Sequence, residues 1–294
     1  MRKIRALIIL ILFIALASIV FAEPLYYESL RQVKYDQICP KTNQPNYVLI
    51  SWNMGGLVSC RNKKSMNVIA NILRDADIVV LQNVRSINGI KMNIEELAKM
   101  LDTKDRNWDY ITSRNVDGDR GDIAFLWDMG KVNINNVHMI RTSRSCGHLM
   151  ERAPVIGSFI FNKERFRIVS FVVSSSNEKA QKEIGNYISC DRLNKDPLVA
   201  LGNFNLPSRK VNPIFREYGF INQTDSKSTF LKDKSGGLFL HKAYNHIFTN
   251  NSIEVCRSGV LDFTGTVDNL QEAKEISDHL PVFIIFRPRS DKKL

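Results

Sequence analysis

From residue 47 onward, the chain alternates short apolar runs with stretches in which apolar residues recur at helical spacing. Residues 47–52 and 77–81 are dense in apolar and β-branched side chains, a pattern typical of buried strands. Residues 65–74 and 93–101 repeat apolar positions every three or four residues, which predicts helices with one buried face. This part of the chain therefore predicts a strand, helix, strand and helix in succession.

Strands dominate the middle of the chain. They are expected at residues 108–113, 122–127, 135–141, 155–161 and 166–173. A third helix is expected at 178–188, a buried strand at 198–201 and a last strand at 280–286. Neither an internal repeat nor a Pro/Gly/Ser-rich linker divides this region. We therefore expect an α/β protein in which helices flank two packed, mostly antiparallel sheets.

The N-terminus has the pattern of a secretory signal. Residues 2–5 include three basic side chains, and residues 6–20 are almost wholly apolar. Val20 and Ala22 place small residues at the −3 and −1 positions before Glu23, which predicts cleavage after Ala22. The protein is then exported, to a periplasm or to the outside of the cell, and keeps no membrane span. The alternative is an uncleaved anchor, because the apolar stretch is just long enough to cross a bilayer.

The expected organisation has four parts. These are a signal peptide at 1–22, a polar lead-in at 23–45, one domain at 46–288 and a basic tail at 289–294. The apolar content of 44% and the charged content of 24% are typical of a globular protein and exclude a disordered or fibrous chain.

The net charge indicates a class of binding partner, and the cysteine content bears on the redox compartment of the protein. The chain has 41 Lys and Arg against 30 Asp and Glu, so its formal charge is +11, or +8 without the three basic residues of the signal. This excess suits a partner with phosphates or anionic lipid. The five cysteines are Cys39, Cys60, Cys146, Cys190 and Cys256. Export permits disulfides, whose pairing stays open, and an odd count leaves one thiol unpaired or bonded to another chain.

Several expected strands end in a polar residue at a turn. These residues are Asn53, Asn83, Asn203, Asn205, Asn245, Asp278 and His279. An Asn after a strand is usually a turn residue, so a single one carries little information. Strand ends that meet at one edge of a sandwich can, however, support a functional site.

The order and spacing of these motifs resemble the endonuclease/exonuclease/phosphatase superfamily, which includes pancreatic-type deoxyribonuclease, apurinic endonucleases, sphingomyelinases and inositol-phosphate phosphatases. The matching segments are ISWNMGGL at 50–57, DADIVVLQNV at 75–84, GDIAFLWD at 121–128, ERAPVIGSF at 151–159, LVALGNFNLP at 198–207, YNHIF at 244–248 and SDHLPVF at 277–283. Together they cover nearly the whole chain after the signal.

This resemblance implies a four-layer α/β sandwich that cleaves phosphate esters with Mg²⁺. It places Asn53, Asn83 and Asp278 at the metal. It gives catalytic positions to Asn203, Asn205, Asp278 and His279, and substrate contacts to Asn205, Asn245 and His279. A phosphodiester needs charge neutralisation and an aligned hydroxide, and carboxylates supply both metal affinity and a base.

The sequence departs from the superfamily at the positions that carry charge. Asn83 stands where relatives have the metal-binding Glu, Asn203 where they have the basic Asp, and Asn245 where they have a third carboxylate. Val172 stands where a His is expected. Mg²⁺ prefers carboxylate oxygen, and the loss of a general base typically costs about 10²–10⁴ in rate. Neutral amides also avoid the repulsion of packed carboxylates that lack a cation.

Three functions remain open from the sequence. The first is an exported domain of this fold with weak or no phosphoesterase activity, which binds a phosphate-bearing ligand, a nucleic acid or a protein. The second is an active Mg²⁺-dependent nuclease or phosphatase with displaced ligands, for which Asp122, Glu151 and Asp262 are candidates. The third is a structural or host-interaction protein that uses another face.

Overall fold

The computed structural model describes the core of the chain. The described residues are 45–55, 63–84, 93–113, 123–139, 154–161, 164–173, 176, 178–189, 197–224, 229–232 and 242–289. The expected signal peptide lies outside them, and so do the lead-in and the basic tail except for residues 45 and 289. Across the described ranges, we find no helix with the length and apolar character needed to cross a membrane.

Two six-stranded sheets form the centre of the molecule. The first has the order β11 (Ile253–Val260), β12 (Val282–Pro288), β1 (Tyr47–Asn53), β2 (Ile78–Gln82), β4 (Ala124–Asp128) and β3 (Trp108–Thr112). The second has the order β5 (Asn133–Met139), β6 (Val155–Phe161), β7 (Glu164–Val172), β8 (Leu198–Asn203), β10 (Asn245–Thr249) and β9 (Ile221–Asn222). Only the β1–β2 and β7–β8 pairs of these sheets are parallel, which confirms the expected, mostly antiparallel arrangement.

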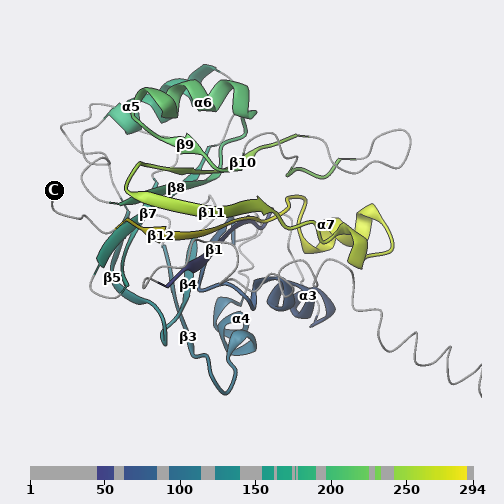
Figure 1. Cartoon of the computed structure of the whole chain (residues 1–294). Helices are drawn as coiled ribbons and strands as arrows, with labels where there is room; N and C mark the ends of the chain where they lie inside the picture. The colour runs from purple at the N-terminus through teal and green to yellow at the C-terminus, as the bar shows by residue number, and fades with distance from the viewer. Residues whose placement is uncertain are drawn as a thin grey trace, which may run out of the picture.

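Helices cover the outer face of each sheet (Figure 1). On the first sheet lie α3 (Lys63–Leu73), α4 (Ile94–Leu101) and α7 (Leu270–Ile276), and on the second lie α5 (Glu178–Ser189) and α6 (Ser208–Glu217). A short 3₁₀ turn, η2, spans Thr264–Thr266. The helix, sheet, sheet and helix layers confirm the four-layer α/β sandwich that the resemblance implied.

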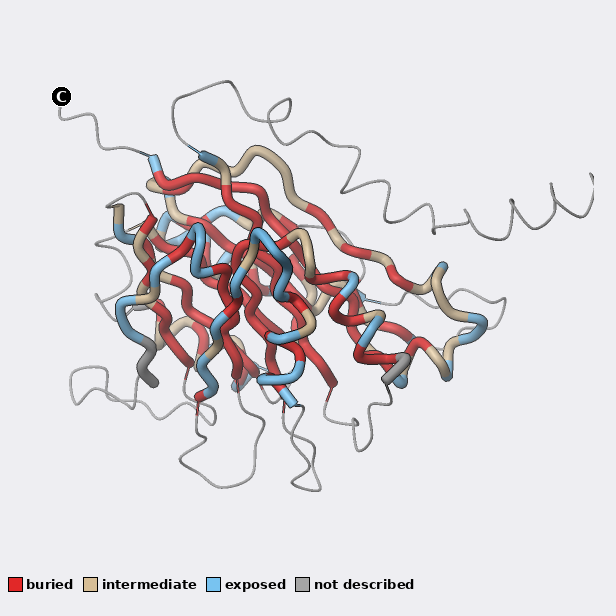
Figure 2. The backbone as a smooth tube through the Cα atoms, turned by 90° about the horizontal axis from the view of Figure 1, so that it is seen from below, coloured by how far each residue is buried: buried red, intermediate tan, exposed pale blue. Residues whose placement is uncertain are grey.

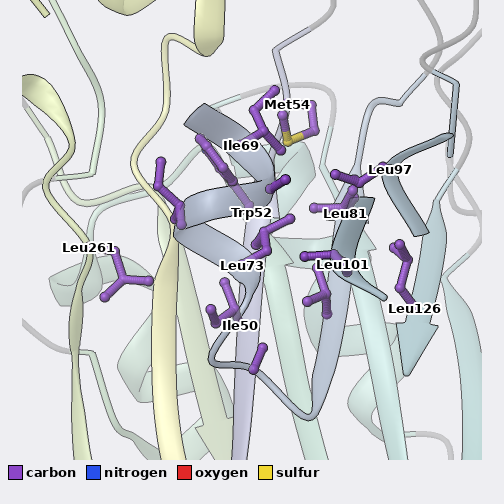
Figure 3. Packing of buried hydrophobic residues seen from close by; sticks show 14 of the residues in the cluster. Ile50, Trp52, Met54, Ile69, Leu73, Leu81, Leu97, Leu101, Leu126 and Leu261 are labelled. Atoms are coloured by element: carbon purple, nitrogen blue, oxygen red, sulfur yellow. The ribbon is translucent and has the colours of Figure 1, made fainter. Parts of the chain in front are cut away.

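Three apolar interfaces hold the four layers together. Strand β1 contributes side chains to two of these interfaces. Ile50 and Trp52 point toward the helices of the first sheet, where they pack with Ile69 and Leu73 of α3 (Figure 3). Leu49 lies in the interface between the sheets. Because side chains alternate along a strand, a continuous apolar run is needed when both faces are covered. The strands accordingly form the buried centre of the molecule (Figure 2).

Four elements of five or more residues were not predicted by the apolar pattern: α6, α7, β10 and β11. Helix α6 includes Pro213, which removes one backbone donor and disfavours an internal helical position. Val211 and Phe215 of the same helix are fully buried against the second sheet. Packing therefore stabilises a helix that local propensity opposes.

The C-terminal end of strand β8 depends on a glycine. Gly202 has a φ of +134°, and a Cβ at this position would lie 2.0 Å from the carbonyl oxygen of Phe171. The neighbouring β7 backbone therefore approaches β8 more closely than any side chain would allow. This approach sets the position of Asn203, the next residue and the end of the strand.

Candidate functional site

The seven predicted site positions lie at one end of the sandwich. In the first sheet, the parallel strands β1 and β2 end side by side, and the antiparallel β12 begins next to the end of β1. In the second sheet, Asn203 at the end of β8 pairs directly with Asn245 at the start of β10. The Asn245 Nδ2 group donates a hydrogen bond of 3.2 Å to the carbonyl oxygen of Leu280, just before β12. The strand ends of the two sheets therefore meet at this end.

A short segment around Thr229 joins the two sheets at the site. The Thr229 hydroxyl accepts hydrogen bonds from the backbone N–H groups of Tyr244 and Asn245, both at 3.0 Å. The backbone carbonyl oxygen of Thr229 accepts a hydrogen bond of 2.8 Å from the N–H of Leu280. The next residue, Phe230, forms a β-bridge with His279. Sequence analysis missed this segment, because two bridging residues leave no periodic signal.

Asn53 and Asn83 form an amide pair at the ends of β1 and β2. The Asn83 Nδ2 group donates to the Asn53 Oδ1 atom at 2.7 Å, and the backbone N–H of Gly55 donates to the same oxygen at 3.1 Å. Asn83 has a φ of +55°, a left-handed conformation that Asn tolerates better than most residues. Both lone pairs of the Asn53 oxygen are thus engaged within the protein.

Asn203 and Asn205 form a tight turn after β8. The Asn203 Oδ1 atom accepts a hydrogen bond of 3.0 Å from the Asn205 N–H, and the Asn205 Nδ2 group donates to the Val173 carbonyl at 2.6 Å. Asn205 has a φ of +50°. Val172, where a His was expected, pairs with Asn203 in the parallel ladder. This part of the site therefore has an apolar side chain beside an amide.

The loop from Ser277 to His279 is fixed against the end of β1. The Ser277 hydroxyl donates to the Asn53 carbonyl at 2.8 Å, and the indole N–H of Trp52 donates to the His279 carbonyl at 2.7 Å. Asp278 packs against Gly55, which has a φ of +57°. A Cβ at that glycine would lie 2.2 Å from the Asp278 Oδ1 atom. The backbone therefore leaves room for this carboxylate only because residue 55 is glycine.

His279 is buried and poorly placed to carry charge. Its ring meets the Phe230 ring edge-on, with 5.1 Å between centroids. Burial lowers the pKa of the imidazole below its ordinary 6.5, and the neighbouring Asp278 carboxylate only partly opposes this. Its Nε2 atom lies 3.8 Å from the Asp278 Oδ1 atom, too far for a hydrogen bond. We conclude that His279 is neutral near neutral pH.

The lowered pKa of His279 predicts a loss of stability in acid. The folded state binds this proton less readily than the unfolded state, so unfolding becomes easier as the pH falls below about 6.5. The free energy of unfolding is measured with urea at a series of pH values. We expect it to decrease less with falling pH in His279→Gln than in the wild type. Equal slopes for the two proteins would contradict this assignment.

Three buried polar atoms of the site lack a hydrogen-bond partner. They are the Asn245 Oδ1, Asp278 Oδ1 and His279 Nδ1 atoms. Asn245 is 1% exposed and His279 is 5% exposed. Buried polar atoms are nearly always paired, and an unpaired one costs about 1–3 kcal/mol. Each of these atoms can pair with water or with a ligand.

The donor set does not fit the Mg²⁺ that the resemblance implies. Of the three positions assigned to metal, only Asp278 has a carboxylate, and the oxygen of Asn53 already accepts two hydrogen bonds. Among the described residues, no three His, Cys, Asp or Glu side chains are grouped so that they could hold a metal ion. A hard dication prefers anionic oxygen ligands, and Asp278 supplies the only one among these three positions.

Of the three acids proposed as displaced ligands, the structure describes only Asp262. Its Oδ1 atom accepts hydrogen bonds from the backbone N–H and the hydroxyl of Thr264, at 2.9 and 2.6 Å, and so begins the turn η2. This role is structural. Asp122 and Glu151 lie outside the described residues.

Solved structures of similar fold include several endonuclease/exonuclease/phosphatase family proteins. An endonuclease/exonuclease/phosphatase family protein from Leptotrichia buccalis is 15% identical, covers 82% of this chain and 99% of its own, and has a TM-score of 0.61. TDP2 of D. rerio, complexed with a single-stranded DNA product, is 13% identical with a TM-score of 0.61, over 83% of this chain and all of its own. A mannosyl-6-phosphatase from Bacteroides thetaiotaomicron is 18% identical with a TM-score of 0.57, over 82% of this chain and 99% of its own.

The likeness is one of fold. No protein-family model matches the chain, and no curated protein sequence does. The similar structures show that the chain has the fold of the endonuclease/exonuclease/phosphatase superfamily, which is the fold that the resemblance implied.

Proposed function

We propose that this domain, which has the fold of a metal-dependent phosphoesterase, is an exported binding domain with little or no catalytic activity. The observation that carries the proposal is the 2.7 Å hydrogen bond between Asn83 and Asn53. It joins two of the positions assigned to metal by an amide–amide contact, which a Glu at position 83 could not make because an ionised carboxylate has no donor. At these two positions the site therefore has a neutral amide pair, and the oxygen that the pair shares is already engaged by two hydrogen bonds.

The remaining groups cannot replace the superfamily's chemistry. Asn203 has the shape of Asp but cannot take a proton from water near neutral pH. His279 is held neutral by burial, so it offers no positive charge to a developing oxyanion. Loss of the base costs about 10²–10⁴ in rate, and loss of the metal removes several kcal/mol more of transition-state stabilisation. These costs together support binding without turnover.

A turnover assay tests this proposal. The chain from Glu23 onward is incubated with bis-nitrophenyl phosphate and with a mononitrophenyl phosphate, in the presence of Mg²⁺ or Mn²⁺. We expect release of nitrophenol no faster than in a matched sample of the His279→Ala variant. Metal-dependent release that disappears in His279→Ala would instead support the active nuclease or phosphatase with displaced ligands.

Export is the second part of the proposal, and it predicts a defined N-terminus. We expect protein recovered from the exported fraction to begin at or near Glu23 when it is sequenced. Cys256 takes part in a disulfide bond, which suits an oxidising compartment, and it should resist alkylation until the sample is reduced. Recovery of the chain only from membranes, with its first residues intact, would contradict export and favour the uncleaved anchor.

A further inference from the structure

We propose that the disulfide bond of Cys256 joins it to Cys39 of the lead-in, and so ties the chain before β1 to strand β11. Cys256 takes part in a disulfide bond, and it is the only cysteine among the described residues. Its partner is therefore one of the other four cysteines or a cysteine of a second chain. The inference goes beyond the proposed function and takes from it only export to an oxidising compartment.

Cys256 lies at the level of the sandwich where β1 begins, away from the candidate site. It stands at a bulge of β11, next to Val255. Val255 pairs with Phe286 of β12, and Phe286 pairs with Tyr47, the first residue of β1. The Cys256 side chain packs on the outer, helix-covered face of the first sheet. The partner cysteine must reach this face at this level.

The chain that enters β1 passes next to the Cys256 sulfur. The Asn46 Oδ1 atom lies 3.9 Å from the Cys256 Sγ atom. A disulfide sulfur carries no proton, so this is a packing contact and not a hydrogen bond. Cys39 is seven residues before Asn46, and a chain of that length reaches up to about 25 Å. Cys39 can therefore approach Cys256 to the roughly 4–7 Å between Cα atoms that a disulfide requires.

Cys190 is separated from Cys256 by both sheets. It directly follows Ser189, the last residue of α5. Helix α5 packs on the outer face of the second sheet (Figure 1), whereas Cys256 packs on the outer face of the first. Stacked sheets lie about 10 Å apart, and one residue spans only about 4 Å. Cys190 therefore cannot reach Cys256.

Cys60 is held toward the site end by helix α3. The helix ends at Leu73, and soon afterwards the Asp77 N–H donates to the Val48 carbonyl, near the start of β1. The 11 residues of α3 extend about 16 Å from there toward the site end. Cys60 precedes Lys63, the first residue of α3, by three residues, which span at most about 11 Å. This link does not bring Cys60 back to the level of Cys256.

Cys146 belongs to the opposite edge of the sandwich. It is seven residues beyond Met139, which lies at the site end of the edge strand β5. Strand β11 lies at the other edge, beside β9, where the Ser258 hydroxyl donates to the Gln223 carbonyl. Five strand spacings, or about 24 Å, separate β5 from β9, in addition to most of the length of a strand. Seven residues reach only about 25 Å, so Cys146 falls short.

Formation of the bond is an oxidation of two thiols. The thiols of Cys39 and Cys256 together lose two protons and two electrons as the S–S bond forms. An external disulfide, such as oxidised glutathione or the disulfide of an oxidoreductase, accepts them and becomes two thiols. The closed loop contains nearly the whole domain, so the bond removes much conformational freedom from the unfolded chain. It should therefore stabilise the domain substantially.

Peptide mapping without reduction tests the proposal directly. The chain from Glu23 onward is oxidised with oxidised glutathione, its free thiols are blocked with N-ethylmaleimide, and it is digested with trypsin. Each cysteine falls in a tryptic peptide of its own: 35–41, 42–61, 145–152, 183–192 and 243–257. We expect peptide 243–257 to be linked to peptide 35–41 in a monomeric protein, and mass spectrometry should show that reduction separates them.

Three results of the mapping would overturn the proposal. They are a link from peptide 243–257 to any of the other three peptides, a dimer joined through Cys256, and a Cys256 thiol that N-ethylmaleimide has modified. The bond is formed in vitro, without metal or ester, so the result depends neither on export by the cell nor on catalysis. Failure here leaves the turnover assay and the N-terminal sequencing unaffected.

Serine variants locate the bond independently. Cys39→Ser should leave Cys256 open to alkylation in unreduced, urea-unfolded protein, a readout that does not require the variant to fold. Its Tm should fall by roughly 5–10 °C, and Cys39→Ser combined with Cys256→Ser should lower the Tm no further. Cys190→Ser is the matched control, in which Cys256 should stay protected. Alkylation of Cys256 in Cys190→Ser but not in Cys39→Ser would contradict the assigned pairing.

Discussion

A variant that restores the three missing carboxylates should gain both Mg²⁺ affinity and hydrolysis of bis-nitrophenyl phosphate. The substitutions are Asn83→Glu, Asn203→Asp and Asn245→Asp, with Val172→His as a fourth. Three of the substituted positions are already adjacent in the sheet, because Asn203 pairs with both Asn245 and Val172 across neighbouring strands. We expect turnover at least about 10²-fold above that of the wild type, the lower end of what a general base contributes.

The local contacts indicate what each restoration does. At position 203 the Asp oxygen can still accept from the Asn205 N–H, so the turn after β8 is kept. At position 83 the change breaks the bond to Asn53, which frees that oxygen for a metal. The introduced glutamate side chain would sit on a backbone with a φ of +55°, at a cost of about 1–2 kcal/mol. At position 245 the change removes the bond to the Leu280 carbonyl, so the domain should be less stable without metal.

Asn250→Asp provides the matched control. The Asn250 Oδ1 atom accepts a hydrogen bond from the Leu198 N–H at 3.1 Å, at the opposite end of β8. This variant adds a carboxylate to a similar turn far along the strand from the site, and it should gain neither metal affinity nor activity. A restored variant that folds and binds Mg²⁺ but stays inert would show that missing charge is not the main defect.

Replacing Arg106 by leucine should lower the free energy of unfolding by about 3–5 kcal/mol. The Arg106 Nε atom lies 2.7 Å from the Asp128 carboxylate, and its Nη2 atom lies 3.3 Å from Asp77. Both carboxylates are 1% exposed. The guanidinium also donates to the Arg74 and Ala76 carbonyls. Without Arg106, the buried Asp128 loses its cation and two carbonyl groups lose their donor.

Lys131→Leu is the control for this prediction. The Lys131 ammonium lies 2.6 Å from Asp77, but its side chain is 53% exposed, so its removal should cost about 1 kcal/mol or less. The loss of unfolding free energy in Arg106→Lys should lie between those of Arg106→Leu and Lys131→Leu. Lysine keeps the charge but cannot make the several contacts of the planar guanidinium. Urea unfolding of all three variants measures the differences. An equal cost for Arg106→Leu and Lys131→Leu would contradict the role given to Arg106.

The fold could be predicted from the sequence where apolar patterns were strong. Residues 47–52 and 77–81 are covered on both faces, so their runs are continuous and their strands were expected almost to the residue. Helix α6 could not be predicted, because Pro213 opposes it locally and the burial of Phe215 that stabilises it depends on the second sheet. Short elements that exist through distant partners, such as the Thr229 bridge, carry no signal of their own.

The positions of the site could be predicted, but their contacts could not. The motifs indicated which strand ends would meet, and the structure places Asn53, Asn203 and Asp278 at that end. A sequence does not show which way an amide points. The bond from Asn83 to Asn53 and the unpaired oxygen of Asn245 emerge only from the packing of the two sheets. The catalytic, substrate and metal roles implied by the resemblance stay predictions.

A calorimetric titration of Mg²⁺, and then of Mn²⁺, into the chain from Glu23 onward tests the central claim most directly. Our account predicts no saturable heat, because Asp278 is the only carboxylate at the metal positions and the Asn53 oxygen is engaged by Asn83 and Gly55. The restored variant, titrated in parallel, should show one binding site for each chain. Saturable binding of one ion by the wild type, lost in Asp278→Asn, would contradict the account.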